Sequence, residues 1–312
     1  MLKILIAEPV HEILQKKLSN AGFLCSYMPK LSFSELKKII PGYNGLVIRS
    51  KFKISKSFID KTENLRFIAR AGAGMENIDT TYAEKKGINC INSPEGNRDS
   101  VGEHALGMVL TLMHKIKISD TEIRKGIWNR QNIGTEIQGK TIGIIGYGNM
   151  GSAFAQRLKG FSVNVIAYDK YKFGFTDDFV KEVTLEKLFN ETDILSIHVP
   201  LTKETEFMIN NDFINHFKKS IYIINTARGK ILKTDDLVKN LKTGKVTGAA
   251  LDVLEYEKTS FEDIFSGKNS PTLQYLLNSG NVILTPHIAG SSDASYKKIA
   301  KILAEKIIAE YI

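Results

Sequence analysis

The sequence has few of the features that would place it outside the ordinary globular proteins. Its 312 residues include only two cysteines, Cys25 and Cys90, which have neither metal-site spacing nor a disulfide framework. A reducing compartment is therefore expected. The apolar run in MLKILIAEPV is too short for a signal peptide or a membrane span. We expect a cytoplasmic protein with no membrane partner and no bound metal.

The chain also lacks a dense block of one charge. Its 43 Lys and Arg residues against 34 Asp and Glu give a formal net charge of +9, but the basic residues are spread along the chain and form no tail. This distribution indicates a solvated surface and no nucleic-acid partner, and the excess would help to attract an anionic substrate. No internal repeat, low-complexity segment or appended interaction motif is evident.

Strand-like runs alternate with helix-like stretches in two series. The first series comprises KILIAE, FLCSYM, GLVIRS, RFIARAG and INCIN; the second comprises TIGIIG, VNVIAYD, DILSIHVP, IYIINTAR, VTGAALD and NVILTP. Alternation of this kind predicts parallel sheets with helices on both faces. The fold class expected is therefore α/β, with two doubly wound parallel-sheet domains, as the chain length also suggests.

Two helical segments are expected to connect these domains. Apolar residues recur at helical spacing from Val101 to Ile116, which predicts one long bridging helix. The final stretch, SSDASYKKIAKILAEKIIAEYI, reads as an amphipathic helix that returns to the first domain. We expect a substrate (lid) domain of residues 1–97 plus 288–312, a nucleotide domain of residues 98–287, and a hinged cleft that closes over ligand.

The segment GYGNMG opens the second series between a buried strand and a helix. In that context GxGxxG predicts a dinucleotide site. Gly146 would form the tight turn, Gly148 would let a pyrophosphate approach the backbone, and Gly151 would let the helix pack on the strand. Free N–H groups at the helix N-terminus would bind the phosphates. The alternative is a packing turn without a ligand.

An acidic residue ends the next strand, as a dinucleotide site requires. Asp169 closes VNVIAYD about 18 residues after Gly151, near the expected separation. Its carboxylate can accept bonds from both ribose hydroxyls and would repel a 2′-phosphate, so NAD is favoured over NADP. Lys170 and Lys172 follow it and weaken that preference.

Three segments place reactive side chains after later strands, where ligands of open α/β sheets bind. INTARG carries Arg228, ALDVLEYE carries Asp252 and Glu257, and ILTPHIAG carries His287. Hydride transfer needs a cation for the substrate carboxylate and a base for the hydroxyl proton, and an acid can orient that base. The alternatives are a surface ion pair for Arg228, a helix entry for His287 and a solvated Glu257.

These motifs, together with HVPLT, resemble in content and order the D-isomer-specific 2-hydroxyacid dehydrogenases, and RAGAGMENID and SVGEH extend the resemblance over nearly the whole chain. The resemblance implies a flavodoxin-like substrate domain and a Rossmann NAD-binding domain. It implies Arg228, Glu257 and His287 as the catalytic set. The family often has proline after the glutamate, where this chain has Lys258, and fewer residues before the histidine.

The resemblance also implies how NAD is held. Besides the glycines and Asp169, it places a further set of residues near the cofactor: Asn149, Met150, Val199, Thr226, Asp252 and Ala73. The family is dimeric through the bridging-helix region, so a homodimer is expected. A chain of this length would lack the C-terminal regulatory domains of some members.

Within the family, GTEIQGKTIGIIGYGNMG is most similar to the D-3-phosphoglycerate dehydrogenases. The resemblance therefore implies oxidation of 3-phospho-D-glycerate by NAD to 3-phosphohydroxypyruvate, the entry to serine biosynthesis. One alternative is reduction of glyoxylate, hydroxypyruvate or another 2-keto acid. A second is a non-catalytic, NAD-sensing protein like the related transcriptional corepressors.

Cationic residues of the first domain are candidates for the substrate's second anion. VIRSKFKI supplies Arg49 and Lys51, and RAGAG supplies Arg70 and Gly72; the alternative is ordinary surface charge. Trp128 would pack at a dimer interface, and the resemblance implies that Arg130 reaches the partner's cleft. The remaining histidines show no ligand spacing, and structural roles are expected for those at positions 104 and 198.

Overall fold

The computed structural model describes residues 1–257 and 270–312, which divide into two compact units. Unit 1 contains Met1–Arg98 and Ser291–Ile312; unit 2 contains Asp99–Glu257 and the described residues from 270 to 290. Lys258 and most of the stretch KTSFEDIFSGKNSP lie outside the described residues. Within the described part, no helix combines the length and apolar character needed to cross a lipid bilayer.

Unit 1 is built on a five-stranded parallel sheet with strand order β2-β1-β3-β4-β5. This order is that of flavodoxin-like folds. The strands follow the first predicted series closely: β1 (Lys3–Ile6), β2 (Leu24–Tyr27), β3 (Gly45–Ile48), β4 (Phe67–Arg70) and β5 (Asn89–Asn92).

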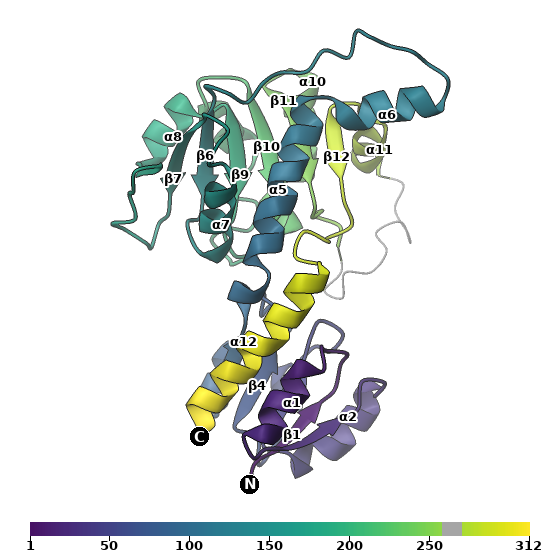
Figure 1. Cartoon of the computed structure of the whole chain (residues 1–312), viewed down its shortest axis with the longest axis vertical. Helices are drawn as coiled ribbons and strands as arrows, with labels where there is room; N and C mark the ends of the chain where they lie inside the picture. Colours follow the sequence, from purple (N-terminus) through teal and green to yellow (C-terminus); the bar gives the residue numbers. More distant parts are fainter. Residues whose placement is uncertain (258–269) are drawn as a thin grey trace. The chain divides into compact units, whose positions relative to one another are not determined.

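Helices cover both faces of this sheet because its strands are apolar on both sides (Figure 1). Ile4 and Ile6 pack with α1 (Ile13–Asn20) and α12 (Asp293–Tyr311), whereas Leu5 packs on the opposite face. That face is covered by α2 (Phe33–Ile39), α3 (Lys56–Ile59) and α4 (Thr80–Lys85), with the short 3₁₀ turn η1 (Ile40–Gly42) after α2.

The final helix α12 is integral to unit 1. Its buried face joins the core of α1, and Lys306 binds the Glu95 carboxylate at 2.8 Å. It passes close to η2 (Pro94–Gly96), where a Cβ on Gly96 would lie 2.6 Å from the Ile299 backbone. The chain therefore returns to the first sheet after completing the second.

Unit 2 is built on a seven-stranded parallel sheet with order β12-β11-β10-β9-β6-β7-β8, a Rossmann arrangement with one further strand. The strand order reverses beside β6, because β7 and β8 follow on one side of it and β9 to β12 on the other. The topological switch point therefore lies between β6 and β9. The strands are β6 (Thr141–Ile145), β7 (Asn164–Tyr168), β8 (Val180–Glu182), β9 (Ile194–Ile197), β10 (Ile221–Asn225), β11 (Val246–Leu251) and β12 (Val282–Leu284).

Two hydrophobic clusters fill the faces of this sheet, and helices cover both faces (Figure 1). One contains α5 (Arg98–Met113) and α7 (Asn149–Arg157). The other contains helices from the second half of the unit: α8 (Leu185–Glu191), α9 (Asn211–His216), α10 (Thr234–Lys242) and α11 (Pro271–Asn278). The fold class predicted from the sequence is confirmed.

The prediction of one long bridging helix is wrong. α5 ends at Met113, and α6 (Ile116–Arg124) begins after Lys115, whose φ of 54° is left-handed and cannot continue a helix. The following loop covers the end of α5, since Thr135 N–H donates to the Met113 carbonyl at 2.9 Å. Ile116 is therefore not part of the buried stripe and is 52% exposed.

Candidate active site

The GYGNMG segment forms the turn from β6 into α7. Gly146 has a φ of 89°, and a Cβ there would lie 2.7 Å from the His198 carbonyl oxygen and 2.9 Å from the Val199 side chain. A Cβ on Gly151 would lie 2.0 Å from the Gly146 oxygen. Both positions thus require glycine, one for the turn and one for packing α7 on the strand.

The surroundings of this turn fit a bound dinucleotide. Apart from its chain neighbours, no atom of the described residues lies within 4 Å of a Cβ placed on Gly148, so the backbone is open to a ligand there. Gly148 is the N-cap of α7, and the amides of Asn149 and Met150 have no acceptor within the helix. At the same edge of the sheet, the buried Thr226 hydroxyl has no hydrogen-bond partner among the described residues. Open backbone, helix N-terminus and unpaired hydroxyl suit pyrophosphate and nicotinamide groups.

Asp169 follows β7 and binds the glycine turn directly. Its Oδ2 accepts the Tyr147 N–H at 2.7 Å. Its Oδ1 accepts the N–H groups of Tyr171 and Lys172 at 2.9 and 3.1 Å. The carboxylate therefore lies beside the glycine turn, where a ribose would be expected. It also connects that turn to the loop that follows β7.

The two lysines after Asp169 both have protein partners. Lys170 forms an ion pair with Glu204, which also accepts the Tyr171 hydroxyl at 2.5 Å. Lys172 donates to the Tyr147 carbonyl at 3.1 Å, with its amine 5.3 Å from the Tyr147 ring centre. These contacts keep both cations occupied within unit 2.

Arg228 stands just beyond β10, in a loop shaped by a fully buried amide. The Asn225 side chain accepts the Ala227 N–H at 3.0 Å and donates to the Arg228 carbonyl at 3.1 Å. The guanidinium donates to the Ala227 carbonyl at 2.7 Å. The loop thus holds the cation at the carboxyl edge of the sheet, before the 3₁₀ turn η3 (Gly229–Ile231).

Glu257 and His287 are directly paired. Glu257 Oε2 lies 2.6 Å from His287 Nδ1, and the two side chains are 17% and 21% exposed. Glu257 Oε1 accepts the Leu254 N–H at 2.5 Å. Because a carboxylate only accepts hydrogen bonds, Nδ1 carries the hydrogen and Nε2 is the basic nitrogen of the neutral ring.

Asp252 anchors the segment that carries this histidine. It is 1% exposed; its Oδ1 accepts the Thr285 hydroxyl and the Ile288 N–H, and its Oδ2 accepts the Ala289 N–H, at 2.6, 2.9 and 2.9 Å. Its carbonyl accepts the His287 N–H at 2.8 Å. These bonds hold His287 at a φ of 55°, which costs energy for a residue with a side chain. They also keep residues 288–290 in unit 2, beyond the expected boundary.

The three catalytic candidates come together because their strands are neighbours. Asn225, Leu251 and Leu284 end β10, β11 and β12 in register. A Cβ on Gly229 would lie 1.9 Å from the Leu254 carbonyl oxygen, so the loops carrying Arg228 and Glu257 touch through their backbones.

The cationic substrate candidates lie in unit 1, after β3 and β4. The Arg49 guanidinium stacks on Tyr296 of α12, 5.6 Å from the ring centre. The Lys51 amine donates to the Leu31 carbonyl at 2.7 Å, so it is engaged within the unit. The buried Glu8 carboxylate accepts the Lys51 N–H at 3.1 Å and holds this loop.

Arg70 ends β4 and packs over Gly72. A Cβ on Gly72, whose φ is 149°, would overlap the guanidinium at 1.7 Å. The Ala73 carbonyl accepts the Asn92 amide at 2.6 Å. These residues form a polar edge at the carboxyl ends of β4 and β5.

Arg130 and Trp128 lie in the loop after α6. Both are exposed, and no hydrogen bond or ion pair of the Arg130 side chain is found among the described residues. His104 and His198 have structural partners instead: His104 contacts Thr285 at 3.2 Å. Burial lowers the pKa of His198 to about 3, so its ring is neutral and bonds Ser196 at 2.8 Å.

Three residues at the site were not singled out from the sequence. Glu204 pairs with Lys170, Gly229 admits the Leu254 backbone, and Glu255 binds α10. Each contact joins positions more than 20 residues apart, so no local pattern shows it. Of the three, only Gly229, the glycine of NTARG, could have been proposed from the sequence, because glycine permits close approach of another backbone segment.

The comparisons with known proteins agree on one family. Residues 106–289 match the model described as D-isomer specific 2-hydroxyacid dehydrogenase, NAD binding domain. A hydroxypyruvate reductase from Thermotoga maritima is 37% identical over 309 residues, which cover 99% of this chain and 98% of that protein.

The chain is also similar to longer relatives and to proteins of known structure with dehydrogenase names. A D-3-phosphoglycerate dehydrogenase from Archaeoglobus fulgidus is 36% identical over 98% of this chain, which spans 57% of that relative's length. The crystal structure of D-lactate dehydrogenase from Aquifex aeolicus, complexed with NAD and lactic acid, matches with a TM-score of 0.80 and 30% identity, over 99% of this chain and 95% of that one.

Proposed function

The chain belongs to the D-isomer specific 2-hydroxyacid dehydrogenase family, whose NAD-binding domain it contains, and from this premise we propose that it oxidises 3-phospho-D-glycerate to 3-phosphohydroxypyruvate, as the first step of serine synthesis. The observation that carries the chemistry is the Glu257–His287 pair at 2.6 Å beside the loop of Arg228.

The proposed mechanism assigns each of these residues one task. Arg228 binds the substrate carboxylate through its planar fork. His287 Nε2 takes the hydroxyl proton, and Glu257 stabilises the imidazolium formed. NAD, which the turn from Gly146 to Gly151 would hold, would supply the hydride acceptor for the same carbon. In the reductive direction the imidazolium returns the proton to the carbonyl oxygen.

Replacing the proposed base tests this mechanism. His287→Ala should lower kcat by about 100- to 10,000-fold, the range for loss of a general base, while NAD binding measured by calorimetry stays within about twofold. Glu257→Gln should also lower kcat, because the imidazolium formed during the reaction loses its negative neighbour. His216→Ala, an exposed histidine of unit 2, is the control. Normal turnover by His287→Ala would remove the mechanism.

A second candidate substrate is hydroxypyruvate, which would be reduced at the same site. It is favoured by the Thermotoga maritima relative, which the chain matches over 98% of its length. A panel of 3-phospho-D-glycerate, D-glycerate and D-lactate with NAD, and of hydroxypyruvate and glyoxylate with NADH, decides between the two. A higher kcat/KM for the unphosphorylated acids would overturn the phosphoglycerate assignment.

The phosphate preference is proposed to come from Arg49. This guanidinium is exposed and stacked on Tyr296, and no carboxylate pairs with it among the described residues. It is therefore available to a second anion on the substrate. Lys51, whose amine already binds a carbonyl, is expected to contribute less.

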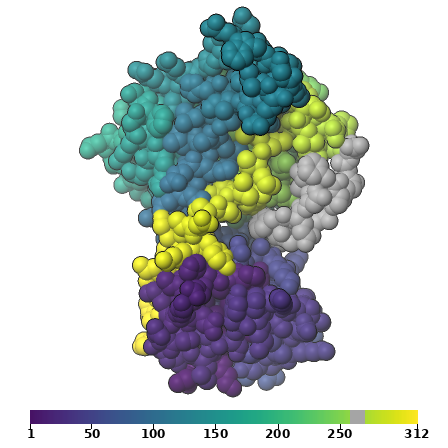
Figure 2. All heavy atoms as spheres, turned by 45° about the vertical axis from the view of Figure 1, so that its right-hand side comes forward, coloured from purple at the N-terminus to yellow at the C-terminus, as the bar shows by residue number. Residues whose placement is uncertain are grey.

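We also propose a homodimer formed through α6 and the following loop. In Figure 2 this segment of unit 2 is the teal lobe at the top of the view. It exposes large apolar side chains that are 49% to 81% accessible: Ile116, Ile123, Ile127, Trp128 and Ile133. Exposed apolar clusters of this kind are typical of interfaces. Trp128→Glu should give a monomer by light scattering, whereas Phe173→Glu, another exposed aromatic residue, should not.

A further inference from the structure

The turn that presents Glu257 is short. Residues 254–257 close through the Glu257 N–H, which donates to the Leu254 carbonyl at 3.1 Å. Both Glu257 oxygens are engaged, one with the Leu254 N–H and one with His287. A displacement of this turn would therefore change the contact with the imidazole.

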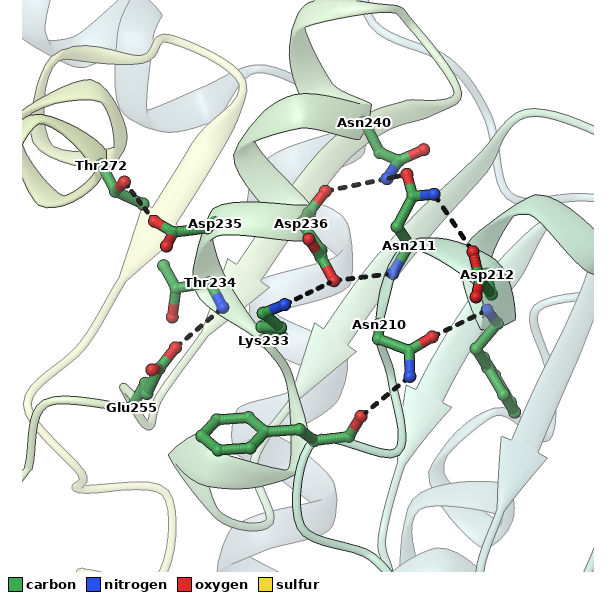
Figure 3. A network of polar contacts seen from close by, with 12 residues as sticks. Asn210, Asn211, Asp212, Lys233, Thr234, Asp235, Asp236, Asn240, Glu255 and Thr272 are labelled. Atoms are coloured by element: carbon green, nitrogen blue, oxygen red, sulfur yellow. Dashed lines mark hydrogen bonds and ion pairs between the residues drawn. The ribbon is translucent and has the colours of Figure 1, made fainter.

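Glu255 connects this turn to α10 (Figure 3). Its Oε2 accepts the N–H of Thr234, the first residue of that helix, at 2.9 Å. Thr234 is 3% exposed. The preceding residue, Lys233, provides no side-chain cap. The carboxylate thus satisfies an amide that has no acceptor within the helix, and its negative charge suits the helix N-terminus.

The two acidic residues in the first turn of α10, Asp235 and Asp236, have different partners from Glu255. Asp235 accepts the Thr272 hydroxyl of α11 at 2.5 Å, and Asp236 accepts the Asn211 N–H at 3.0 Å (Figure 3). Neither carboxylate contacts residues 254–257 in a bond that the structure shows. Asp235 is therefore a matched control for Glu255. It has the same charge, lies beside Thr234 in the first turn of α10, and bonds a residue of a separate helix.

We propose that Glu255 is a positioning residue, which fixes the turn so that Glu257 is held on His287 Nδ1. The proposal rests on the proposed roles of Glu257 and His287. Glu255 touches neither substrate nor cofactor in this scheme. It acts through Glu257 alone, which distinguishes it from a residue that only stabilises α10.

Steady-state kinetics of the full chain with NAD and 3-phospho-D-glycerate test the proposal. D-Glycerate replaces that substrate if the panel shows it to be preferred. Glu255→Ala should lower kcat about threefold to tenfold, since small displacements of catalytic groups are costly, and should change KM for NAD less than about twofold. Its pH–rate profile should approach that of Glu257→Gln. Glu255→Gln retains an acceptor oxygen and should recover at least about half of the turnover.

Two further comparisons separate positioning from stability. Thr234→Pro removes the donated N–H but leaves Glu255 in place, and proline is well tolerated at the first helical position. It also removes the Thr234 hydroxyl, which is hydrogen-bonded to the Tyr256 side chain, so Thr234→Val is its matched control. The loss of turnover in Thr234→Pro beyond that in Thr234→Val should match the Glu255→Ala kinetics. Asp235→Ala should leave kcat within about twofold although α10 loses a bond to α11. Adding Glu255→Ala to Glu257→Gln should cost no further turnover beyond about twofold, because both act on one contact.

The outcomes are distinguishable from failure of the proposed function. If His287→Ala is fully active, the proposed function fails first. If His287→Ala is inactive while Glu255→Ala keeps a normal kcat and pH profile, the positioning role is overturned. Equal losses in Asp235→Ala, or a full additional loss in the Glu257→Gln background, would also overturn it. If Glu255→Ala does not fold, the kcat and pH–rate profile of Glu255→Gln and Thr234→Pro are compared with those of Asp235→Ala instead. Thermal unfolding then checks that these variants are folded.

Discussion

Adding one methyl group at Gly229 should separate Glu257 from His287, the proposed base. A Cβ there would lie 1.9 Å from the oxygen and 2.0 Å from the carbon of the Leu254 carbonyl, and 2.5 Å from the Glu255 nitrogen. All three are backbone atoms, so no side-chain rotation relieves the clash. Either the turn of residues 254–257 or the loop of Arg228 must move.

The size of the movement follows from contact distances. Ordinary carbon contacts begin near 3.4 Å, so a separation of about 1.5 Å is needed. If the turn takes all of it, the 2.6 Å contact between Glu257 and His287 opens to about 4 Å, beyond hydrogen-bond range. Misplacements of about 1 Å can cost about 100-fold in rate. We expect Gly229→Ala to lower kcat about 10- to 100-fold. It should also raise KM for the hydroxy-acid substrate, because Arg228, which is proposed to bind the substrate carboxylate, is adjacent.

The assay compares this variant with a glycine that has room for a methyl group. Outside the backbone of α5 itself, no atom in the described part of the chain lies within 4 Å of a Cβ on Gly107, in the interior of that helix. Gly107→Ala should therefore be fully active and about 1 kcal/mol more stable. NAD affinity should be unchanged in both, since neither touches the turn at Gly146. Wild-type kcat together with a wild-type pH–rate profile in Gly229→Ala would refute the reasoning.

Three other expectations concern charge. Arg49→Ala should reduce kcat/KM for 3-phospho-D-glycerate about tenfold to 100-fold more than for D-glycerate, while Arg66→Ala, before β4, should affect neither selectively. Glu204→Gln should free Lys170 for a 2′-phosphate and raise the NADP-to-NAD ratio of kcat/KM several-fold, because the freed ammonium can pair with the phosphate; an unchanged ratio would assign Glu204 to folding alone. Burial lowers the pKa of His198 from the usual 6.5 to about 3, so between these values only the unfolded chain binds this proton. The free energy of unfolding should therefore fall by up to about 1.4 kcal/mol per pH unit below pH 6.5, and His198→Gln should lose that slope in urea titrations.

The sequence predicts most of this fold because its strands are long enough to show their character. Every run proposed as a strand contains one in the structure. β8 was missed because it has three residues at the sheet edge, with only Val180 fully buried. The break at Lys115 was missed because apolar spacing continues across it. Only the backbone shows that Ile116 and the residues after it leave the core.

The candidate site divides in the same way. Residues that a local motif places relative to a strand end, such as Gly146, Asp169 and His287, can be named from the sequence. Contacts that depend on two separate loops cannot. Glu255 meets Thr234 across 21 residues of chain, and the approach of Leu254 to Gly229 requires β10 and β11 to be adjacent. Such contacts follow from the packing of the sheet, which the motif does not encode.

Asp169 shows why a motif residue can have more than one role. Each carboxylate oxygen can accept about two hydrogen bonds. Oδ1 already accepts the N–H groups of Tyr171 and Lys172, and Oδ2 accepts that of Tyr147. A ribose can therefore add one bond at Oδ2, and a second hydroxyl must displace a backbone amide. Substituting Asp169 would loosen the glycine turn as well as remove a charge, so lost activity with NAD alone would not measure cofactor choice. The ratio between NADP and NAD does, and Glu204 changes the charge at this position without releasing the turn.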